Sequence, residues 1–192
     1  MYMEALPDLA QQPYLEPLLS HLEWAVANPR VLSIGAGAVY EAYRYLETYG
    51  FSRLQIDCID PVRNAAAQTP RPSDDFGAQV RWEALDLARF APRRQYHLIW
   101  SSDLFDLLDD HLGKRVLAHL LQAAAPDGEV VIGSHAGANR LRNLAKACGV
   151  PAAAMTLRRG LDGAKLFLHI KQADALVNRL ATSRPPALIQ LN

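Results

Sequence analysis

Hydrophobic and polar positions follow two periods along the chain, which predicts strands and helices in alternation. Apolar residues recur at three- and four-residue spacing in residues 14–27, as in an amphipathic helix. Short apolar runs bounded by glycine, proline or charged residues predict strands. The predicted strands are 31–35, 54–60, 80–87, 96–102, 129–135, 152–159 and 164–171. The predicted helices are 14–27, 38–49, 64–68, 114–125 and 138–148, and residues 103–110 open a helical region.

Glycine and proline mark the boundaries of these elements. Gly50 and Gly149 stand where helix C-caps are expected. Pro126-Asp127-Gly128 predicts a turn before the fifth strand. The last two strands flank a turn containing Asp162-Gly163, which predicts an antiparallel hairpin.

Strands that alternate with helices predict a parallel sheet with helices on both faces. The fold class is therefore α/β, a doubly wound and mostly parallel seven-stranded sheet whose terminal strand is antiparallel. Ligands of such sheets bind beyond the carboxyl ends of the strands, where the strand order reverses. This rule predicts the place of a site before any motif is considered.

Length and composition favour one soluble globular domain. The 192 residues fit a single domain over 1–171, followed by a tail over 172–192. Twenty basic residues balance twenty acidic ones, so neither nucleic acid nor an anionic membrane is an expected partner. The acidic, proline-broken N-terminus is unlike a signal peptide, and no run of 18 apolar residues exists. Two cysteines without zinc spacing fit a reduced cytoplasmic setting.

Charge is uneven near the C-terminus. Residues 140–192 carry nine basic residues against two acidic ones. A solvated surface explains this excess, and an acidic substrate or an acyl-carrier partner is the alternative; the candidate side chains are Arg140, Arg142, Arg158 and Arg159. The apolar end of the tail suggests a homodimer contact as a further alternative.

The first predicted strand runs directly into Gly35-Ala36-Gly37. Glycine there lets the backbone turn sharply and approach a ligand, and the following helix offers unpaired N–H groups. Tyr40 stands where a dinucleotide site would need a third glycine, which counts against NAD. A simple tight turn remains the alternative for this fragment.

Polar residues follow the next strands at the same edge. Asp60 lies 23 residues after Gly37, a spacing at which an acid can bind ribose hydroxyls; an Asp-Pro turn is the alternative. Asp86 and Leu87 end the third strand, where they can frame an adenine, or Asp86 can cap a helix. Ser101 and Ser102 end the fourth strand.

Two histidines are candidate general bases. His135 follows the fifth strand and His111 follows the fourth, although a histidine at such a place more often makes structural hydrogen bonds. Four acids form a run just before His111: Asp103, Asp106, Asp109 and Asp110. They favour the start of a helix over a metal site, because hard cations need convergent oxygens.

Six segments in order resemble class I S-adenosylmethionine-dependent methyltransferases over residues 30–171. They are VLSIGAGAVYE, LQIDCIDP, VRWEALDL, YHLIWSSDLFDLL, AAAPDGEVVIG and LDGAKLFLHIK. The final antiparallel strand belongs to that resemblance. The patterns IGxGxxxE, SxLFDxLxD and PxGEVVIG most resemble bacterial proteins that make 3-hydroxy fatty acid methyl esters.

The resemblance implies a cofactor site for S-adenosyl-L-methionine. Its glycine loop would lie against the methionine part, beside an acid of that loop. The second strand would bind the ribose, the third the adenine, and the fourth would form the floor. The implied residues are Gly35, Ala36, Gly37, Glu41, Asp60, Pro61, Asp86, Leu87, Ser101 and Ser102. Ser33 and Val39 replace a common acid and a common glycine, which predicts weaker binding.

The resemblance implies a methyltransferase acting on a small organic acceptor, at a carboxyl or hydroxyl oxygen. The N-terminal helix region, residues 1–29, would form its cap. Three alternatives stay open: an enzyme that uses the cofactor without methyl transfer, a non-catalytic binding protein on the same fold, and a nicotinamide-dependent oxidoreductase.

Overall fold

The predicted strands form one seven-stranded sheet in a computed structural model. The structure describes residues 15–35, 38–60, 79–84, 87, 90–91, 94–135, 137–160 and 165–171. The strands are β1 (Arg30–Ile34), β2 (Gln55–Asp60), β3 (Val80–Ala84), β4 (Tyr96–Ser101), β5 (Ala124–Ser134), β6 (Met155–Arg159) and β7 (Leu166–Lys171). The helices are α1 (Leu15–Ala25), α2 (Ala38–Tyr49), α4 (Asp110–Ala123) and α5 (Ala138–Ala147).

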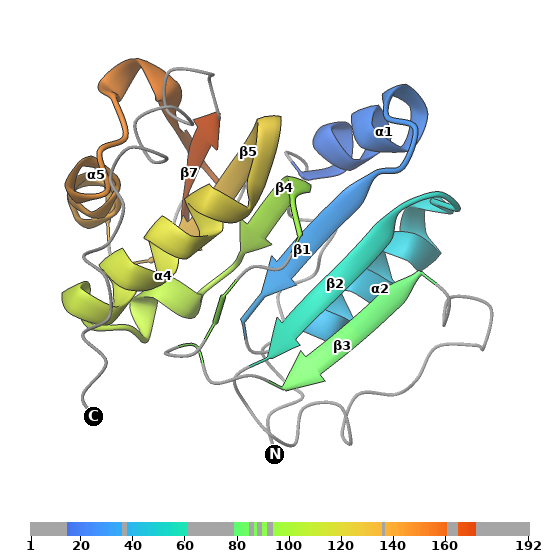
Figure 1. Cartoon of the computed structure of the whole chain (residues 1–192), viewed down its shortest axis with the longest axis horizontal. Coiled ribbons are helices and arrows are strands. Elements are labelled where there is room, and N and C mark those ends of the chain that lie inside the picture. Colours follow the sequence, from blue (N-terminus) through green and yellow to red (C-terminus); the bar gives the residue numbers. More distant parts are fainter. Residues whose placement is uncertain are drawn as a thin grey trace, which may run out of the picture.

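The strand order is β3-β2-β1-β4-β5-β7-β6, and Figure 1 shows this order from β3 to β7. The first five strands pair in parallel, and β7 pairs antiparallel with both β5 and β6. The chain therefore winds outward from β1 to β3 and then returns to the other side of β1. This arrangement confirms the doubly wound α/β fold and its antiparallel terminal strand.

Each face of the sheet carries its own apolar cluster, because successive side chains of a strand point to opposite faces. Leu32, Ile34 and Ile99 pack against α4 and α5. Val31 and Trp100 pack on the other face with α1 and α2. In Figure 1, α4 lies in front of the sheet and α2 behind it. The fully buried strands explain why the sequence shows continuous apolar runs instead of clean alternation.

Two helix ends have the predicted glycine. Gly50 has φ +64° after α2, and Gly149 has φ +82° after α5. The N–H of Gly50 donates to the Leu46 carbonyl, 2.9 Å away. Both glycines adopt the left-handed backbone conformation that ends helices, so these two predictions are confirmed.

The fifth strand begins earlier than the sequence predicts. It starts at Ala124, which pairs with Tyr96, and the register then shifts so that Glu129 pairs with Leu98. The predicted turn lies inside this excursion, where Asp127 has φ +64°. A Cβ on Gly128 would lie 2.8 Å from one carbonyl oxygen and 2.9 Å from another, so only glycine fits. The predicted turn before the strand is therefore corrected to an irregularity inside β5, because pairing with β4 continues on both sides of these residues.

The region 103–110 is less helical than predicted. It holds one 3₁₀ turn, Leu104–Asp106, and α4 begins only at Asp110. The Asp109 side chain accepts from the Leu112 N–H at 2.8 Å and caps the helix. The helix therefore starts four residues before the predicted 114.

The N-terminal helix α1 is fastened at the amino edge of the sheet by Glu23. Its carboxylate accepts from the backbone N–H groups of Ser52, Arg53 and Leu54 at 2.8 to 3.0 Å. The Trp24 side chain on this helix is 80% exposed. The predicted cap over residues 1–29 is described only from Leu15 onward.

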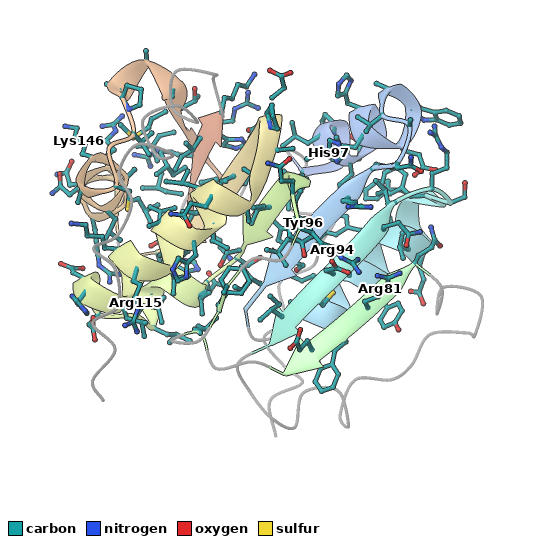
Figure 2. The ribbon with its side chains drawn as sticks, in the orientation of Figure 1. Arg81, Arg94, Tyr96, His97, Arg115 and Lys146 are labelled. Atoms are coloured by element: carbon teal, nitrogen blue, oxygen red, sulfur yellow. The ribbon has the colours of Figure 1, made fainter. Side chains whose placement is uncertain are left out.

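A second set of polar contacts lies at the amino end of β4. The Tyr96 hydroxyl donates to Asp57 Oδ2 at 2.8 Å, and Arg94 lies 3.8 Å from the same oxygen. Burial, with the neighbouring Asp57, raises the pKa of Tyr96. Figure 2 shows Tyr96, Arg94 and His97 at the start of β4, opposite to the edge where β4 ends. These groups connect β4 to β2 across β1.

In the part of the chain that the structure describes, no helix is long and apolar enough to cross a membrane.

Candidate functional site

A hollow lies at the carboxyl end of β1, where the strand order reverses. It contains about 290 Å³ of space, part of it open to solvent. Its lining comes from β1, α2 and the segment after β4: Ile34, Gly35, Ala38, Glu41, Ser102, Asp103, Leu104 and Leu107. Its enclosed cavity volume is only about 40 Å³. Small-molecule sites span about 300–1,000 Å³, so the hollow that the described residues form is smaller than a whole ligand site.

Gly35 makes the turn from β1 toward α2. Its φ of +139° is a conformation that side chains rarely adopt. Its N–H donates to the Ile59 carbonyl at 3.0 Å, and its carbonyl accepts from Ala38 at 3.2 Å. Because Gly35 has no side chain, the backbone itself forms the wall of the hollow at this position.

Glu41 brings a carboxylate into the hollow from the first turns of α2. The Ser102 hydroxyl donates to its Oε1 at 2.6 Å, and the Trp100 indole N–H donates to its Oε2 at 3.0 Å. Trp100 is itself buried on the α2 face of β4. These two hydrogen bonds hold the Glu41 carboxylate between the start of α2 and the end of β4.

Burial raises the pKa of Glu41 above its usual range. The nearby charge of Asp103 acts in the same direction. Hydrogen bonds from Ser102 and Trp100, together with the charge of Lys165, act against it. Desolvation is the largest of these effects, so the neutral carboxyl is favoured relative to a free glutamate.

Next to Glu41, Asp103 lies between two basic side chains. The Lys165 ammonium is 2.6 Å from Asp103 Oδ1, and His135 Nε2 is 3.6 Å from the same oxygen. The Lys165 side chain is only 6% exposed, whereas those of Asp103 and His135 are about half exposed. The Lys165 ammonium also lies over the Phe167 ring, 5.6 Å from its centre. Lys165 therefore neutralises Asp103 from the protein side, and His135 does so from the solvent side when it is protonated.

Gly133 leaves the space through which Lys165 reaches Asp103. A Cβ at Gly133 would lie 2.4 Å from the Ser102 carbonyl oxygen and 2.9 Å from Lys165 Cε. It would also lie 2.7 Å from the Phe167 ring. The close packing of β4, β5 and β7 at this edge thus depends on a missing side chain.

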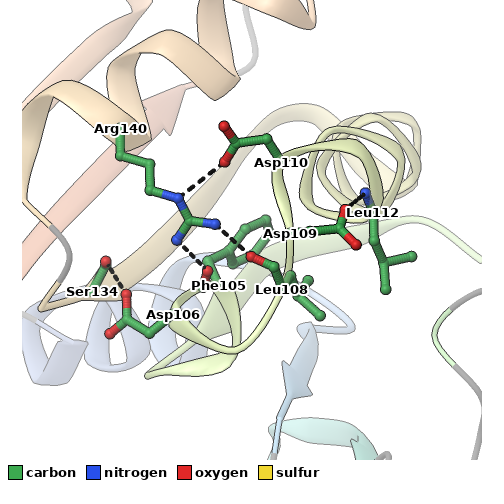
Figure 3. Close-up of polar contacts among 8 residues, drawn as sticks. All are labelled: Phe105, Asp106, Leu108, Asp109, Asp110, Leu112, Ser134 and Arg140. Carbon is green, nitrogen blue, oxygen red and sulfur yellow. Dashed lines mark hydrogen bonds and ion pairs between the residues drawn. The ribbon is translucent and has the colours of Figure 1, made fainter.

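Arg140 clamps the segment after β4 from the first turn of α5. Its guanidinium donates to the carbonyls of Phe105 and Leu108, and its Nε lies 3.1 Å from Asp110 Oδ1 (Figure 3). The sequence offered Arg140 as a group for an acidic substrate or a solvated charge. It binds this protein's own backbone instead, whereas Arg142, Arg158 and Arg159 are exposed.

Asp106 ties the same segment to the end of β5. Its side chain accepts from the Ser134 hydroxyl and, at 2.8 Å, from the His135 backbone N–H. The four acids between 103 and 110 therefore have separate partners. Among the described residues, no group of three or more possible metal ligands occurs.

The structure brings together part of the predicted cofactor set. Gly35, Glu41 and Ser102 line the hollow. Ser101 is buried at the end of β4, where its hydroxyl has no hydrogen-bond partner among the described residues, and it does not line the hollow. Leu87 is buried in the cluster on the α4 face. The remaining predicted contacts lie outside the described residues or, for Asp60, have an undescribed side chain: Ala36, Gly37, Asp60, Pro61 and Asp86.

The two predicted histidines differ in their position. His135 lies at the edge of the site beside Asp103. His111 is exposed in the first turn of α4 and does not line the hollow. Ser33, which replaces a common acid, is buried and donates to the Ala38 carbonyl at 3.4 Å. It therefore contacts the start of α2 directly.

Lys165, and its ion pair with Asp103, are features of the site that the sequence did not predict. A signal existed, because an antiparallel last strand begins at the edge where the parallel strands end. A lysine directly before that strand lies at the carboxyl edge for this reason. Its pairing with Asp103 depends on side-chain packing, which no spacing indicates.

Solved structures of methyltransferases share this fold. The N-methyltransferase NodS from Bradyrhizobium japonicum WM9, solved in complex with S-adenosyl-L-homocysteine, is 17% identical with a TM-score of 0.62, over 87% of this chain and 90% of that one. A SAM-dependent methyltransferase from Leishmania major is 15% identical with a TM-score of 0.62, over 86% and 74%. An O-methyltransferase family protein from Burkholderia thailandensis is 16% identical with a TM-score of 0.59, over 82% and 56%.

At these identities the similarity establishes the fold class, a Rossmann-like methyltransferase fold. The sequence matches no protein-family model and no curated protein sequence. The activity must therefore be argued from the site, because one fold can carry many functions.

Proposed function

We propose that this chain is an S-adenosyl-L-methionine-dependent methyltransferase that acts on a small organic acceptor, at a carboxyl or hydroxyl oxygen. The observation that carries the proposal is the hollow at the end of β1, which Gly35, Glu41 and Ser102 line. It occupies the place where doubly wound sheets bind ligands. Neighbours with this fold include N- and O-methyltransferases.

The charges of the hollow fit this cofactor. S-adenosyl-L-methionine supplies a methyl group on a positively charged sulfur and also carries an ammonium group. Glu41 offers a carboxylate whose described partners are neutral donors, so a cationic ligand would find a counter-charge there. Gly35 lets the backbone approach the ligand without a side chain in between.

The chain's own residues would act mainly by binding and orientation. Methyl transfer from a sulfonium is an in-line displacement, for which proximity is the main contribution. Leu104 and Leu107 give the hollow an apolar wall, in which Leu104 is buried and Leu107 is exposed. Arg140 holds that wall in place through the carbonyls of Phe105 and Leu108.

The choice of acceptor decides whether a base is needed. A carboxylate acceptor already carries the attacking electron pair, whereas a hydroxyl must lose a proton. His135 would accept such a proton in this proposal, supported by Asp103, which lies 3.6 Å from its Nε2 and would stabilise the imidazolium. The oxygen acceptor itself comes from the narrower resemblance to enzymes of fatty acid methyl ester synthesis.

The first test is calorimetric titration of S-adenosyl-L-homocysteine into the wild type and Asp60→Ala. We expect micromolar binding that the variant loses, because Asp60 is the predicted ribose ligand. Glu83→Ala is the matched control, since Glu83 is an exposed acid on β3. No binding to the folded wild type would contradict the proposal and favour a non-catalytic protein.

Mass analysis of acceptors then tests the reaction. A carboxylic acid or alcohol incubated with S-adenosyl-L-methionine should gain the mass of one methylene unit. Cofactor turnover without that gain would favour another use of the same cofactor. Binding of NAD(P) in its place would favour an oxidoreductase.

A further inference from the structure

The Glu41 carboxylate lines the hollow, and no basic side chain in the described part of the chain pairs with it. Its two described partners, the Ser102 hydroxyl at 2.6 Å and the Trp100 indole at 3.0 Å, are neutral. Among the described residues, Glu41 forms no ion pair. A carboxylate has about four acceptor positions, so two donors leave positions for a ligand.

Three titratable groups lie around Glu41 among the residues that the structure describes. Asp103 follows β4, Lys165 precedes β7, and Tyr45 lies one turn further along α2. The Lys165 ammonium is 2.6 Å from Asp103, so its charge is largely compensated there. His135 lies on the far side of Asp103, and the Tyr45 pKa is raised by burial and by Glu41. None of these groups supplies Glu41 with a direct counter-ion.

Ser102 can serve both protonation states of Glu41. A hydroxyl donates to a carboxylate, and after rotation it accepts from a protonated carboxyl group. The distance of 2.6 Å suits an O–H···O bond in either direction. The indole N–H of Trp100 can only donate, and it has the second oxygen of Glu41 as its acceptor in both states. Burial favours the neutral form and raises the pKa of Glu41.

We propose that Glu41 is the cation-binding group of the hollow, and that it carries a proton when the hollow is empty and releases it to solvent when a cationic ligand binds. The proposal rests on the proposed function, in which that ligand is S-adenosyl-L-methionine. Its ammonium or its sulfonium is the cation that takes the place of the proton. When the cation replaces the proton, the buried carboxyl group is either protonated and neutral or paired with the cation, so it is never an isolated buried charge.

Proton release links the affinity for the cofactor to pH. The cation favours ionised Glu41, so the ligand binds more tightly as pH rises through the titration of the empty site. The logarithm of the association constant should rise by up to about one per pH unit in that window, because one group is involved. Above the window the affinity should become independent of pH.

Calorimetry in two buffers measures the released proton directly. S-adenosyl-L-methionine and S-adenosyl-L-homocysteine are each titrated at a slightly acid pH, in phosphate and in a Tris-type buffer of larger ionisation enthalpy. The difference in observed enthalpy gives the number of protons released. Both ligands carry the ammonium, and only the first carries the sulfonium.

Glu41→Gln and Glu47→Gln form a matched pair of variants. Both remove one carboxyl group from α2, but Glu47 is exposed and paired with Arg44. We expect proton release to disappear in Glu41→Gln and to persist in Glu47→Gln. If Glu41→Gln binds too weakly to measure, Ser102→Ala provides the comparison. It should move proton release to higher pH, because the ionised carboxylate loses a hydrogen-bond donor and the pKa of Glu41 rises further.

The outcomes separate this inference from the proposed function. Release with both ligands supports the inference and assigns the ammonium, and release with S-adenosyl-L-methionine alone supports it and assigns the sulfonium. Binding without proton release, or equal release by Glu41→Gln, overturns the inference and leaves the proposed function intact. Failure of the folded wild type to bind either ligand overturns both.

Discussion

Gly133 shows how closely β4, β5 and β7 pack beside the hollow. The clash that matters is with the Ser102 carbonyl oxygen, which would lie 2.4 Å from an added Cβ, because backbone cannot rotate away as the Lys165 side chain can. We expect Gly133→Ala to lower the free energy of unfolding by about 1–3 kcal/mol, the usual cost of overpacking. Urea unfolding followed by circular dichroism measures this change.

A second glycine provides the control for that prediction. Gly113 lies inside α4, and a Cβ there would lie 3.7 Å from the Leu144 methyl groups, an ordinary contact. Gly113→Ala should raise the free energy of unfolding by about 0.5–1 kcal/mol, because alanine is the better helix former. Equal effects of the two substitutions would contradict the packing argument.

At the level of residues, the sequence predicts groups that a strand end or a loop presents. Gly35, Glu41 and Ser102 follow from a glycine loop and from the end of a strand, and they meet in the hollow. The Lys165–Asp103 pair was not predictable in this way. It depends on the space at Gly133, which is a property of three packed strands.

At the level of elements, the segment after β4 depends on Arg140 for its position. We expect Arg140→Met to leave two carbonyls without their charged donor and to lower the free energy of unfolding by about 1–3 kcal/mol. The exposed Asp110 should contribute little to that loss. Hydrogen exchange of residues 104–108 should accelerate as the wall of the hollow loosens.

Arg142→Met is the control on the same helix. Arg142 is exposed on α5, and its loss should change neither the stability nor the exchange of residues 104–108. If both variants accelerated exchange to the same degree, the clamp would not explain the order of this segment.

Helix α1 depends on Glu23 for its attachment to the sheet, as the segment after β4 depends on Arg140 for its position. Water can reach the N–H groups of the exposed Ser52 and Arg53, but Leu54 is buried. Glu23→Ala should therefore cost about 1–3 kcal/mol in unfolding free energy, mainly from the unsatisfied N–H of Leu54. Thermal or urea unfolding measures the loss, and Glu47→Ala on α2 is the exposed control. Similar losses in both variants would show that the anchor contributes nothing specific.

The ends of helices were predictable where a left-handed backbone conformation requires glycine. Gly50 and Gly149 end their helices as expected. The start of β5 was not predictable, because Pro126-Asp127-Gly128 is a turn by every local signal. The strand resumes around it through pairing with β4, which is a tertiary effect.

At the scale of the whole molecule, the raised pKa of Glu41 affects global stability. For an acid whose pKa is raised by folding, the stabilising contribution is complete below the ordinary value of 4.5 and is lost as pH rises through the raised value. The amide side chain in the Glu41→Gln variant cannot ionise. The unfolding free energy of this variant minus that of the wild type should therefore rise with pH in that window, by up to about 1.4 kcal/mol per pH unit.

Denaturant unfolding from about pH 4 to about pH 8 checks this prediction. The difference should level off above the raised pKa, when Glu41 of the wild type is fully ionised. Glu47→Gln corrects for the loss of one negative charge from α2. A difference that falls with rising pH would show that the folded protein favours the ionised form.

The pairing of β1 with β4 also has a consequence for how the chain reaches its native state. Val31 and Leu98 are neighbours in the sheet and stand 67 positions apart in the sequence. Closing so long a loop is slow, because its entropy is lost before the contacts form. The hollow at this seam cannot exist until both halves of the chain have met. Ligand affinity should therefore return after helical content, and no earlier than the burial of Trp100, which lies on β4 at the same seam.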